Sequence, residues 1–265
     1  MAKVELPGFP FSGSFGNLSL YKRKDSDKWI LRRKGGISKE RLNYDPTLEG
    51  SRQQMTRFGG CSSAAKMIRD SMLDLTHLAD GKLHGRLLST CGSVMDLDLP
   101  MPAHGKQSII FSKALYLLQG YTMNLMNPFD SIISTPIEFS INRAQHQASL
   151  TIPPLTPRKN FTSPWNFPFF RFRVNLGIIR DLIFNGAAYL PVNPDGGEHT
   201  ESDVTEWLPV TSQYGGETIT LSFDEPVFDN SCYLMLAIGV EFGTQLKGGL
   251  EHVRGAGSAK ILGVE

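Results

Sequence analysis

The sequence has few cysteines and no long hydrophobic run. Its three cysteines, Cys61, Cys91 and Cys232, lie far apart, which is typical of buried reduced thiols rather than of a disulfide framework. No stretch reaches the roughly 18 consecutive apolar residues of a membrane-spanning helix. The first residues also lack the apolar run of a secretory signal. We therefore expect cytoplasmic synthesis without a signal peptide, and the sequence leaves the final location open.

Sequence motifs of catalysis are missing as well. There is no G-x-S-x-G elbow, no phosphate-binding loop and no dinucleotide fingerprint, and the six histidines lack the short spacings of metal sites. The acidic pairs Asp96/Asp98 and Asp224/Glu225 fall at the expected ends of elements, where solvated turn roles are usual. The sequence therefore predicts a protein that is not an enzyme and needs neither a metal nor a cofactor.

The overall charge is close to neutral, but one basic segment stands near the start. The formal net charge is +1, so no overall field recruits nucleic acid or a membrane. Two strand-like runs, residues 17–23 and 29–34, flank a polar turn, which predicts a β-hairpin. Between Lys22 and Arg41, nine basic residues stand against three acidic ones. The cations that we assign to a contact surface are Lys22, Arg23, Lys24, Arg32, Arg33 and Lys34.

This basic hairpin admits three interpretations. Its arginines could bind phosphates while Tyr21 and Trp29 stack on bases, or its charges could protect a solvated edge. It could also be an arm that docks on another subunit. An isolated two-stranded hairpin is marginally stable in water, so we favour the arm and keep nucleic acid as the less supported partner.

A helical segment follows the hairpin. Residues 51–54 fit a capping box with Ser51 as the N-cap. Apolar and small residues then recur at three- and four-residue spacing to about residue 79, which predicts one long helix with a seam for close packing. The Gly59-Gly60 pair could bend or split it. A second helix is expected over residues 82–94, and residues 108–119 are ambiguous between helix and strand. The seam residues are Met55, Phe58, Ala65, Ile68, Met72 and Leu75.

The C-terminal half is rich in short strand-like runs. Turn residues separate these runs and no helical pattern intervenes, which favours an antiparallel sandwich. The run from residue 233 to 240 is apolar throughout and predicts a strand covered on both faces. The expected strands are residues 137–142, 148–152, 169–176, 178–184, 218–223, 233–242 and 259–264.

An aromatic loop precedes one of these strands. Residues 161–170 hold five aromatic side chains and two prolines, so they cannot all belong to a regular central strand. The loop could bind a glycan, contact another chain, or fill the core at the edge of the sandwich. Its candidate residues are Phe161, Trp165, Phe167 and Phe169.

Several segments give the chain a family resemblance. It resembles an uncharacterised family of Bacteroidota proteins of similar length, and this resemblance implies an architecture but no activity or catalytic residue. Cys61 and the aromatic loop depart from the family pattern. The segments that carry the resemblance are residues 16–22, 33–41, 45–46, 57–59, 64–66, 118–121, 236–242 and 259–264.

We therefore expect an α+β fold in three parts: a basic β-hairpin arm at 1–44, a helical segment at 45–119 and an immunoglobulin-like antiparallel β-sandwich at 120–265. The favoured function is a self-assembling structural subunit of a filament, tube or other ordered homo-oligomeric particle. In that hypothesis other copies of the chain are the partners, through the hairpin and the long helix. The alternative is a binding module, for nucleic acid through the hairpin or for a glycan through the aromatic loop.

Overall fold

A computed structural model describes residues 2–4, 12–22, 29–33, 35–99, 106–193, 200–223 and 229–265. The chain divides into two compact units, residues 1–54 and residues 55–265. The expected boundaries at 44/45 and 119/120 are not where this division falls. The first unit extends into the long helix, and the rest of the helical segment belongs to the same unit as the sandwich.

The N-terminal unit holds a four-stranded antiparallel sheet. The predicted hairpin is present as β3 (Leu18–Lys22) and β4 (Trp29–Arg33), and its turn lies outside the described residues. Two further strands, β1 (Ala2–Val4) and β2 (Gly13–Phe15), flank it in the order β1-β4-β3-β2. The predicted hairpin is thus the centre of a larger sheet, because the first fifteen residues supply both outer strands.

Short capped helices connect this sheet to the long helix α2. Helix α1 (Lys39–Tyr44) is capped by Ser38, whose hydroxyl accepts a hydrogen bond from a backbone N–H of the first turn. Asp45 then caps the 3-10 helix η1 (Pro46–Leu48), which runs directly into α2 (Glu49–Asp70). The predicted capping box at Ser51 is therefore wrong, because the helix has already started at Glu49 and Asp45 provides the cap upstream.

The long apolar stripe is shared between two elements. The Gly59-Gly60 pair does not split α2, which ends at Asp70 and is followed by the 3-10 helix η2 (Leu73–Leu78). The prediction of one continuous helix to residue 79 is thus wrong in its last part. Helix α3 (Leu83–Asp96) matches the second predicted helix. The ambiguous residues 108–119 are neither a strand nor an α-helix and form two 3-10 turns, η3 (Phe111–Lys113) and η4 (Leu115–Leu117). A short helix α4 (Phe129–Ile132) precedes the strands.

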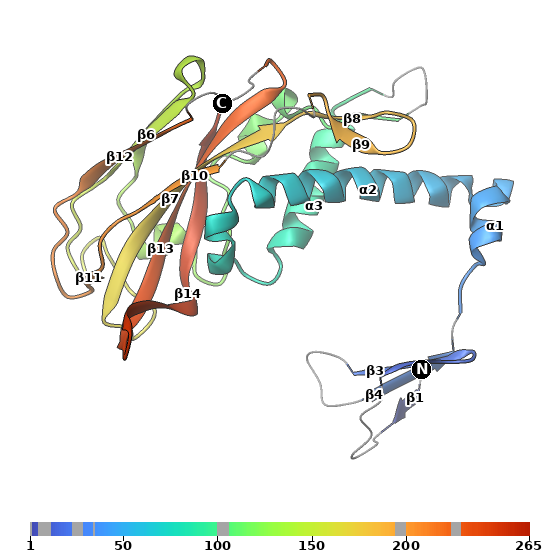
Figure 1. Cartoon of the computed structure of the whole chain (residues 1–265), viewed down its shortest axis with the longest axis horizontal. Helices are drawn as coiled ribbons and strands as arrows, with labels where there is room; N and C mark the ends of the chain where they lie inside the picture. The colour runs from blue at the N-terminus through green and yellow to red at the C-terminus, as the bar shows by residue number, and fades with distance from the viewer. Residues whose placement is uncertain are drawn as a thin grey trace. The chain divides into compact units, whose positions relative to one another are not determined.

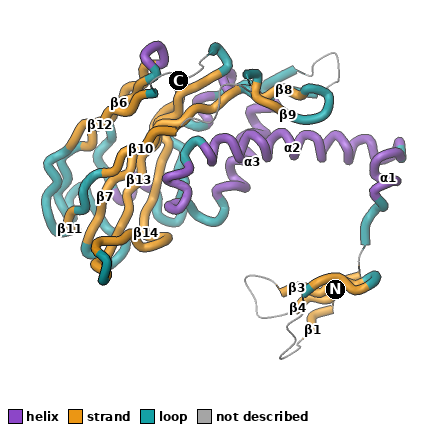
Figure 2. The backbone as a smooth tube through the Cα atoms, viewed as in Figure 1, coloured by secondary structure: helices purple, strands orange, loops and turns teal. Residues whose placement is uncertain are grey.

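The C-terminal half contains two antiparallel sheets packed face to face (Figures 1 and 2). The smaller sheet has the order β12-β6-β5, and the larger has the order β10-β7-β13-β14, with β11 also paired to β7. These sheets form an antiparallel β-sandwich, and together with the helices they confirm the expected α+β class. The sandwich strands are β5 (Glu138–Asn142), β6 (Gln147–Ile152), β7 (Phe169–Arg180), β10 (Thr200–Val204), β11 (Leu208–Pro209), β12 (Glu217–Ser222), β13 (Cys232–Leu246) and β14 (Gly249–Val264).

One predicted break in this sandwich is absent. The sequence analysis places a gap at Gly177 between two strands, whereas β7 runs through it, and a separate β8 (Leu182–Phe184) pairs with β9 (Tyr189–Pro191). A Cβ atom at Gly177 would overlap the backbone oxygen of Ser71. Gly177 therefore lets the residue after α2 approach the sheet closely, which is a second reason for glycine inside a strand.

The larger sheet separates two hydrophobic cores. On β13, Tyr233, Met235 and Ala237 belong to the core under the helices, and the alternate residues 234, 236 and 238 belong to the core between the sheets. Helices α2 and α3 cover one face, and the β12-β6-β5 sheet covers the other (Figure 1). Double coverage explains why residues 233–240 of this strand are apolar throughout, as the sequence predicts.

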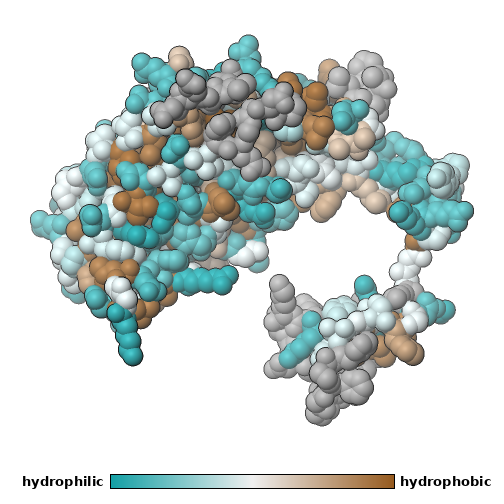
Figure 3. Space-filling model, viewed as in Figure 1, coloured by the Kyte–Doolittle hydropathy of each residue, from teal (hydrophilic) through white to brown (hydrophobic). Residues whose placement is uncertain are grey.

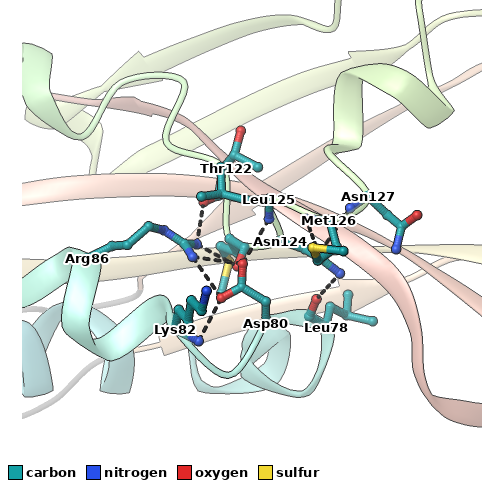
Figure 4. Close-up of polar contacts among 10 residues, drawn as sticks. Leu78, Asp80, Lys82, Arg86, Thr122, Asn124, Leu125, Met126 and Asn127 are labelled. Atoms are coloured by element: carbon teal, nitrogen blue, oxygen red, sulfur yellow. Dashed lines mark hydrogen bonds and ion pairs between the residues drawn. The ribbon is translucent and has the colours of Figure 1, made fainter.

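A partly buried ion pair ties the helical layer to the strands (Figure 4). Asp80 accepts two hydrogen bonds of 2.7 Å from Nη1 of Arg86, and the other Nη of Arg86 donates to the carbonyls of Thr122 and Met123. Nearby, Asn124 donates to the carbonyl of Gly257 in β14. These contacts fix where η2 ends and α3 begins.

Candidate functional site

The basic residues of the N-terminal sheet divide between its two faces. In the β3–β4 pairing, Arg33 lies opposite Leu18 and Arg32 lies opposite Ser19. Because paired residues share a face and neighbours alternate, Arg33 and Lys22 lie on one face and Arg32 lies on the other. The described cations therefore do not form one basic face. The remaining predicted contact residues lie outside the described part of the chain: Arg23, Lys24 and Lys34.

The face that carries Lys22 and Arg33 is otherwise apolar. Phe15 is 81% exposed and Leu18 is 41% exposed. Of the described side chains in this unit, only Ile30 is buried, and it lies on the opposite face. We call the following residues, which share one face by their register, the N-terminal apolar face: Phe15, Leu18, Leu20, Trp29 and Leu31.

The predicted helix seam is covered along only part of its length. Ala65 and Ile68 in α2, and Met72 and Leu75 beyond it, are fully buried. At the start of the stripe, by contrast, Met55 is 57% exposed and Phe58 is 59% exposed. The seam is therefore packed within the chain at four of its six residues, and no described element of this unit covers the other two.

A groove lies beside the exposed start of this stripe. It encloses a cavity of about 360 Å³, which we call the α2 groove. A Cβ atom at Gly60 would lie 2.7 Å from the ring of Tyr189, so that ring closes the floor of the groove. A Cβ atom at Gly59 would have no neighbour within 4 Å. Figure 3 shows hydrophobic side chains on the β8–β9 hairpin that forms the opposite wall. The lining residues are Met55, Thr56, Gly59, Gly60, Ser63, Phe184, Ala187, Ala188 and Tyr189.

The aromatic loop closes the end of the core between the two sheets. The ring centres of Phe161 and Phe170 are 4.4 Å apart, and those of Trp165 and Phe242 are 5.2 Å apart. Phe161 is buried, whereas Trp165, Phe167 and Phe169 are half-buried. An open cavity of about 580 Å³ remains beside these side chains. Core filling thus accounts for most of the loop, and one surface of it stays accessible.

A charged cluster on β13 was missed by the sequence analysis. Glu241 is fully buried, and its two carboxylate oxygens accept hydrogen bonds of 2.6 Å and 2.7 Å from Nε of Arg171 and Arg173. Nε2 of His77 lies 2.9 Å from one of the same oxygens. Burial alone would raise the pKa of Glu241, but the hydrogen bonds from His77 and both arginines outweigh it and lower that pKa from 4.5 to about 2. The signal in the sequence was a carboxylate in an apolar strand and two arginines two positions apart.

Aromatic rings frame this cluster. The guanidinium carbon of Arg171 lies 4.3 Å from the centre of the Trp207 ring. Trp207 in turn rests on β13, where a Cβ atom at Gly243 would lie 2.6 Å from its indole. The rings of His77 and His252 are 5.0 Å apart, edge to face. We call Glu241, Arg171, Arg173 and His77 the Glu241 cluster.

The cysteines offer no activated nucleophile. All three are buried and unpaired, as the sequence predicts. Burial raises the pKa of Cys61, and it raises the pKa of Cys91 to about 12. Since the thiolate is the reactive form, both thiols are held in their unreactive protonated state at neutral pH.

Neither protein-family models, nor curated proteins, nor solved structures give a match to this chain. Within the described ranges, no helix combines the length and apolar character needed to cross a membrane. The same residues contain no group of three or more His, Cys, Asp or Glu side chains placed to hold a metal ion.

Proposed function

We propose that this protein is a self-associating structural subunit and not an enzyme. Its contact is formed between the N-terminal apolar face of one copy and the α2 groove of another. The observation that carries this proposal is the exposure of Met55 and Phe58 beside the groove, on a stripe whose later apolar residues, from Ala65 to Leu75, are fully buried. A contiguous exposed apolar surface of this kind is typical of a binding interface.

The N-terminal sheet supplies the complementary surface. Its own strands bury Ile30 and leave Phe15 and Leu18 open, so the sheet lacks the core that a small domain needs. Two different apolar surfaces on one chain fit a head-to-tail contact, which propagates into a ring or a filament. This arrangement supports a role as the repeating unit of an ordered particle.

The size of the contact favours concentration-dependent assembly. Burying a large apolar side chain contributes roughly 1.5–3 kcal/mol. Four such side chains are open at the two surfaces, namely Phe15, Leu18, Met55 and Phe58. Their sum is comparable with the roughly 4–15 kcal/mol that association costs in lost freedom of motion. Dilution should therefore dissociate the particle.

A complementation experiment tests this contact. Gly59→Arg blocks the α2 groove while leaving the helix intact, because nothing lies near that Cβ position. Phe15→Ser removes the most exposed side chain of the N-terminal apolar face. Light scattering and sedimentation should show larger species for the natural chain and monomers for each variant. An equimolar mixture of the two variants should form dimers, since each supplies the surface that the other lacks.

The matched control is Leu73→Ser. Leu73 is 61% exposed, lies in η2 and belongs to neither surface, so this variant should assemble like the natural chain. A strictly monomeric natural chain at every concentration would reject the proposal. Monomers in the variant mixture would reject the head-to-tail arrangement.

A glycan-binding module is the second candidate, and the open aromatic cavity favours it. Half-buried aromatic rings beside a cavity of about 580 Å³ suit stacking on sugar rings. Loss of glycan retention in Trp165→Ala, with retention kept in the exposed-loop variant Lys159→Gln, which lies outside the cavity lining, would support this function. Nucleic-acid binding has less support, because the described cations divide between two faces. In addition, the guanidinium carbon of Arg32 lies 5.6 Å from the centre of the Tyr21 ring, so that ring is already in contact with a side chain.

A further inference from the structure

The Glu241 cluster holds more positive charge than its carboxylate can balance. Arg171 and Arg173 each place Nε on Glu241. Among the residues that the structure describes, Glu241 is the carboxylate within ion-pair distance of either arginine. Two guanidinium groups against one carboxylate leave one unmatched positive charge before His77 or His252 is considered.

The unmatched positive charge lies where it is largely shielded from solvent. Both arginine side chains are 20% exposed, and Glu241 is 1% exposed. A charge removed from water is costly unless a partner neutralises it. The position therefore favours a counter-anion more strongly than an arginine on an open surface would.

Among the residues that the structure describes, none accepts a hydrogen bond from the Nη groups that would meet this anion, and both guanidinium groups are held in place. A guanidinium has five N–H donors, and the hydrogen bonds to Glu241 use only the one on Nε of each arginine. The two arginines are two positions apart on β7, so their side chains leave the same face of the sheet roughly 7 Å apart at the backbone. Glu241 fixes both from one side, and Trp207 stacks on Arg171 from another.

We propose that Arg171 and Arg173 bind a small oxyanion, such as phosphate, sulfate or a free carboxylate, through their Nη groups. Glu241 is a positioning residue in this site, since it orients both guanidinium forks. A fork that presents parallel N–H donors matches the oxygen pairs of such anions. The site is separate from the assembly contact, and it stands whether or not the chain self-associates.

Binding is measured with the full chain and three probes, namely inorganic phosphate, sulfate and acetate, each against sodium chloride at equal ionic strength. We expect at least one probe to raise the unfolding temperature saturably, with a midpoint on the order of 1 mM or lower. The fluorescence of Trp207 should change with the same midpoint, and Trp207→Phe should lose that signal. Comparing phosphate and sulfate with acetate identifies which class of oxyanion the site prefers.

Two variants locate the binding. Arg173→Gln should abolish the saturable effect, and Arg173→Lys, which keeps the charge and the fold but loses the fork, should weaken it at least about fivefold. The matched control Arg41→Gln removes an exposed arginine of the other compact unit and should bind as the natural protein does. The proposal is overturned if no probe exceeds chloride, or if both Arg173 variants bind like the natural protein.

Discussion

The two ends of the apolar stripe on α2 differ in what covers them. Ala65 and Ile68 are fully buried, and the stripe continues into η2 with Leu75 in the same core. Met55 and Phe58 continue the stripe in the other direction and are more than half exposed. A periodic apolar stripe therefore marks a surface that must be buried. The element that buries it can come from the same chain or from another one.

The largest loss of stability at the buried end of the stripe should come from adding a single methyl group. Gly177→Ala should prevent folding or cost more than about 4 kcal/mol, because its Cβ atom would overlap the Ser71 backbone oxygen immediately after α2. Circular dichroism and chemical unfolding check this. Gly85→Ala in α3, which meets nothing within 4 Å, is the control and should leave the fold intact. A normally stable Gly177→Ala protein would contradict the close approach.

Truncations at the two ends should differ by several kcal/mol. Ile68→Ala empties a fully buried position and should lower the free energy of unfolding by roughly 2–5 kcal/mol. Phe58→Ala removes a side chain that is 59% exposed, and a dilute monomer should lose less than about 1 kcal/mol.

Concentration then sharpens the contrast between these two variants. Unfolding at low and high protein concentration should leave the Ile68→Ala deficit unchanged, because its contacts lie within one chain. The Phe58→Ala deficit should grow with concentration if other copies cover this end. A large loss of unfolding free energy for Phe58→Ala in the dilute monomer would show that the chain itself buries Phe58.

Acid should lower the free energy of unfolding by protonating Glu241, which contacts His77 in η2 at the buried end of the stripe. Its folded pKa of about 2 lies below its ordinary 4.5, so the ionised form stabilises the fold above pH 4.5. This contribution, roughly 3 kcal/mol, is lost as the pH falls from 4.5 through 2, because the unfolded chain binds the proton first. Unfolding measured from pH 6 to pH 2 should show the loss, and Glu241→Gln should flatten that part of the curve. An unchanged pH dependence in Glu241→Gln would contradict it.

The sequence predicts the positions of helices and strands better than it predicts which residues bury their faces. The apolar run of β13 and the hairpin of β3 and β4 follow from local composition, and both are present. Gly177 was misread as a break because its close contact is with Ser71, which is distant in sequence. Arg171 and Arg173 lie in a predicted strand whose partner the sequence does not identify, and only the pairing of β7 with β13 brings them to Glu241.

The smallest expected effects come from the two adjacent glycines at the open end. Gly60→Ala should cost roughly 1–3 kcal/mol, because its Cβ atom would lie 2.7 Å from the Tyr189 ring, and that ring is anchored by the hydrogen bond from its hydroxyl to the Gln107 carbonyl. Gly59→Ala should instead stabilise the monomer by up to about 1 kcal/mol, since it removes backbone freedom and meets nothing. Chemical unfolding in dilute solution measures the free energy of unfolding of both variants. A change of the same sign in the two variants would contradict the geometry of the groove. Because alanine at position 59 is far smaller than arginine, Gly59→Ala should still assemble, which separates helix stability from blockage of the groove.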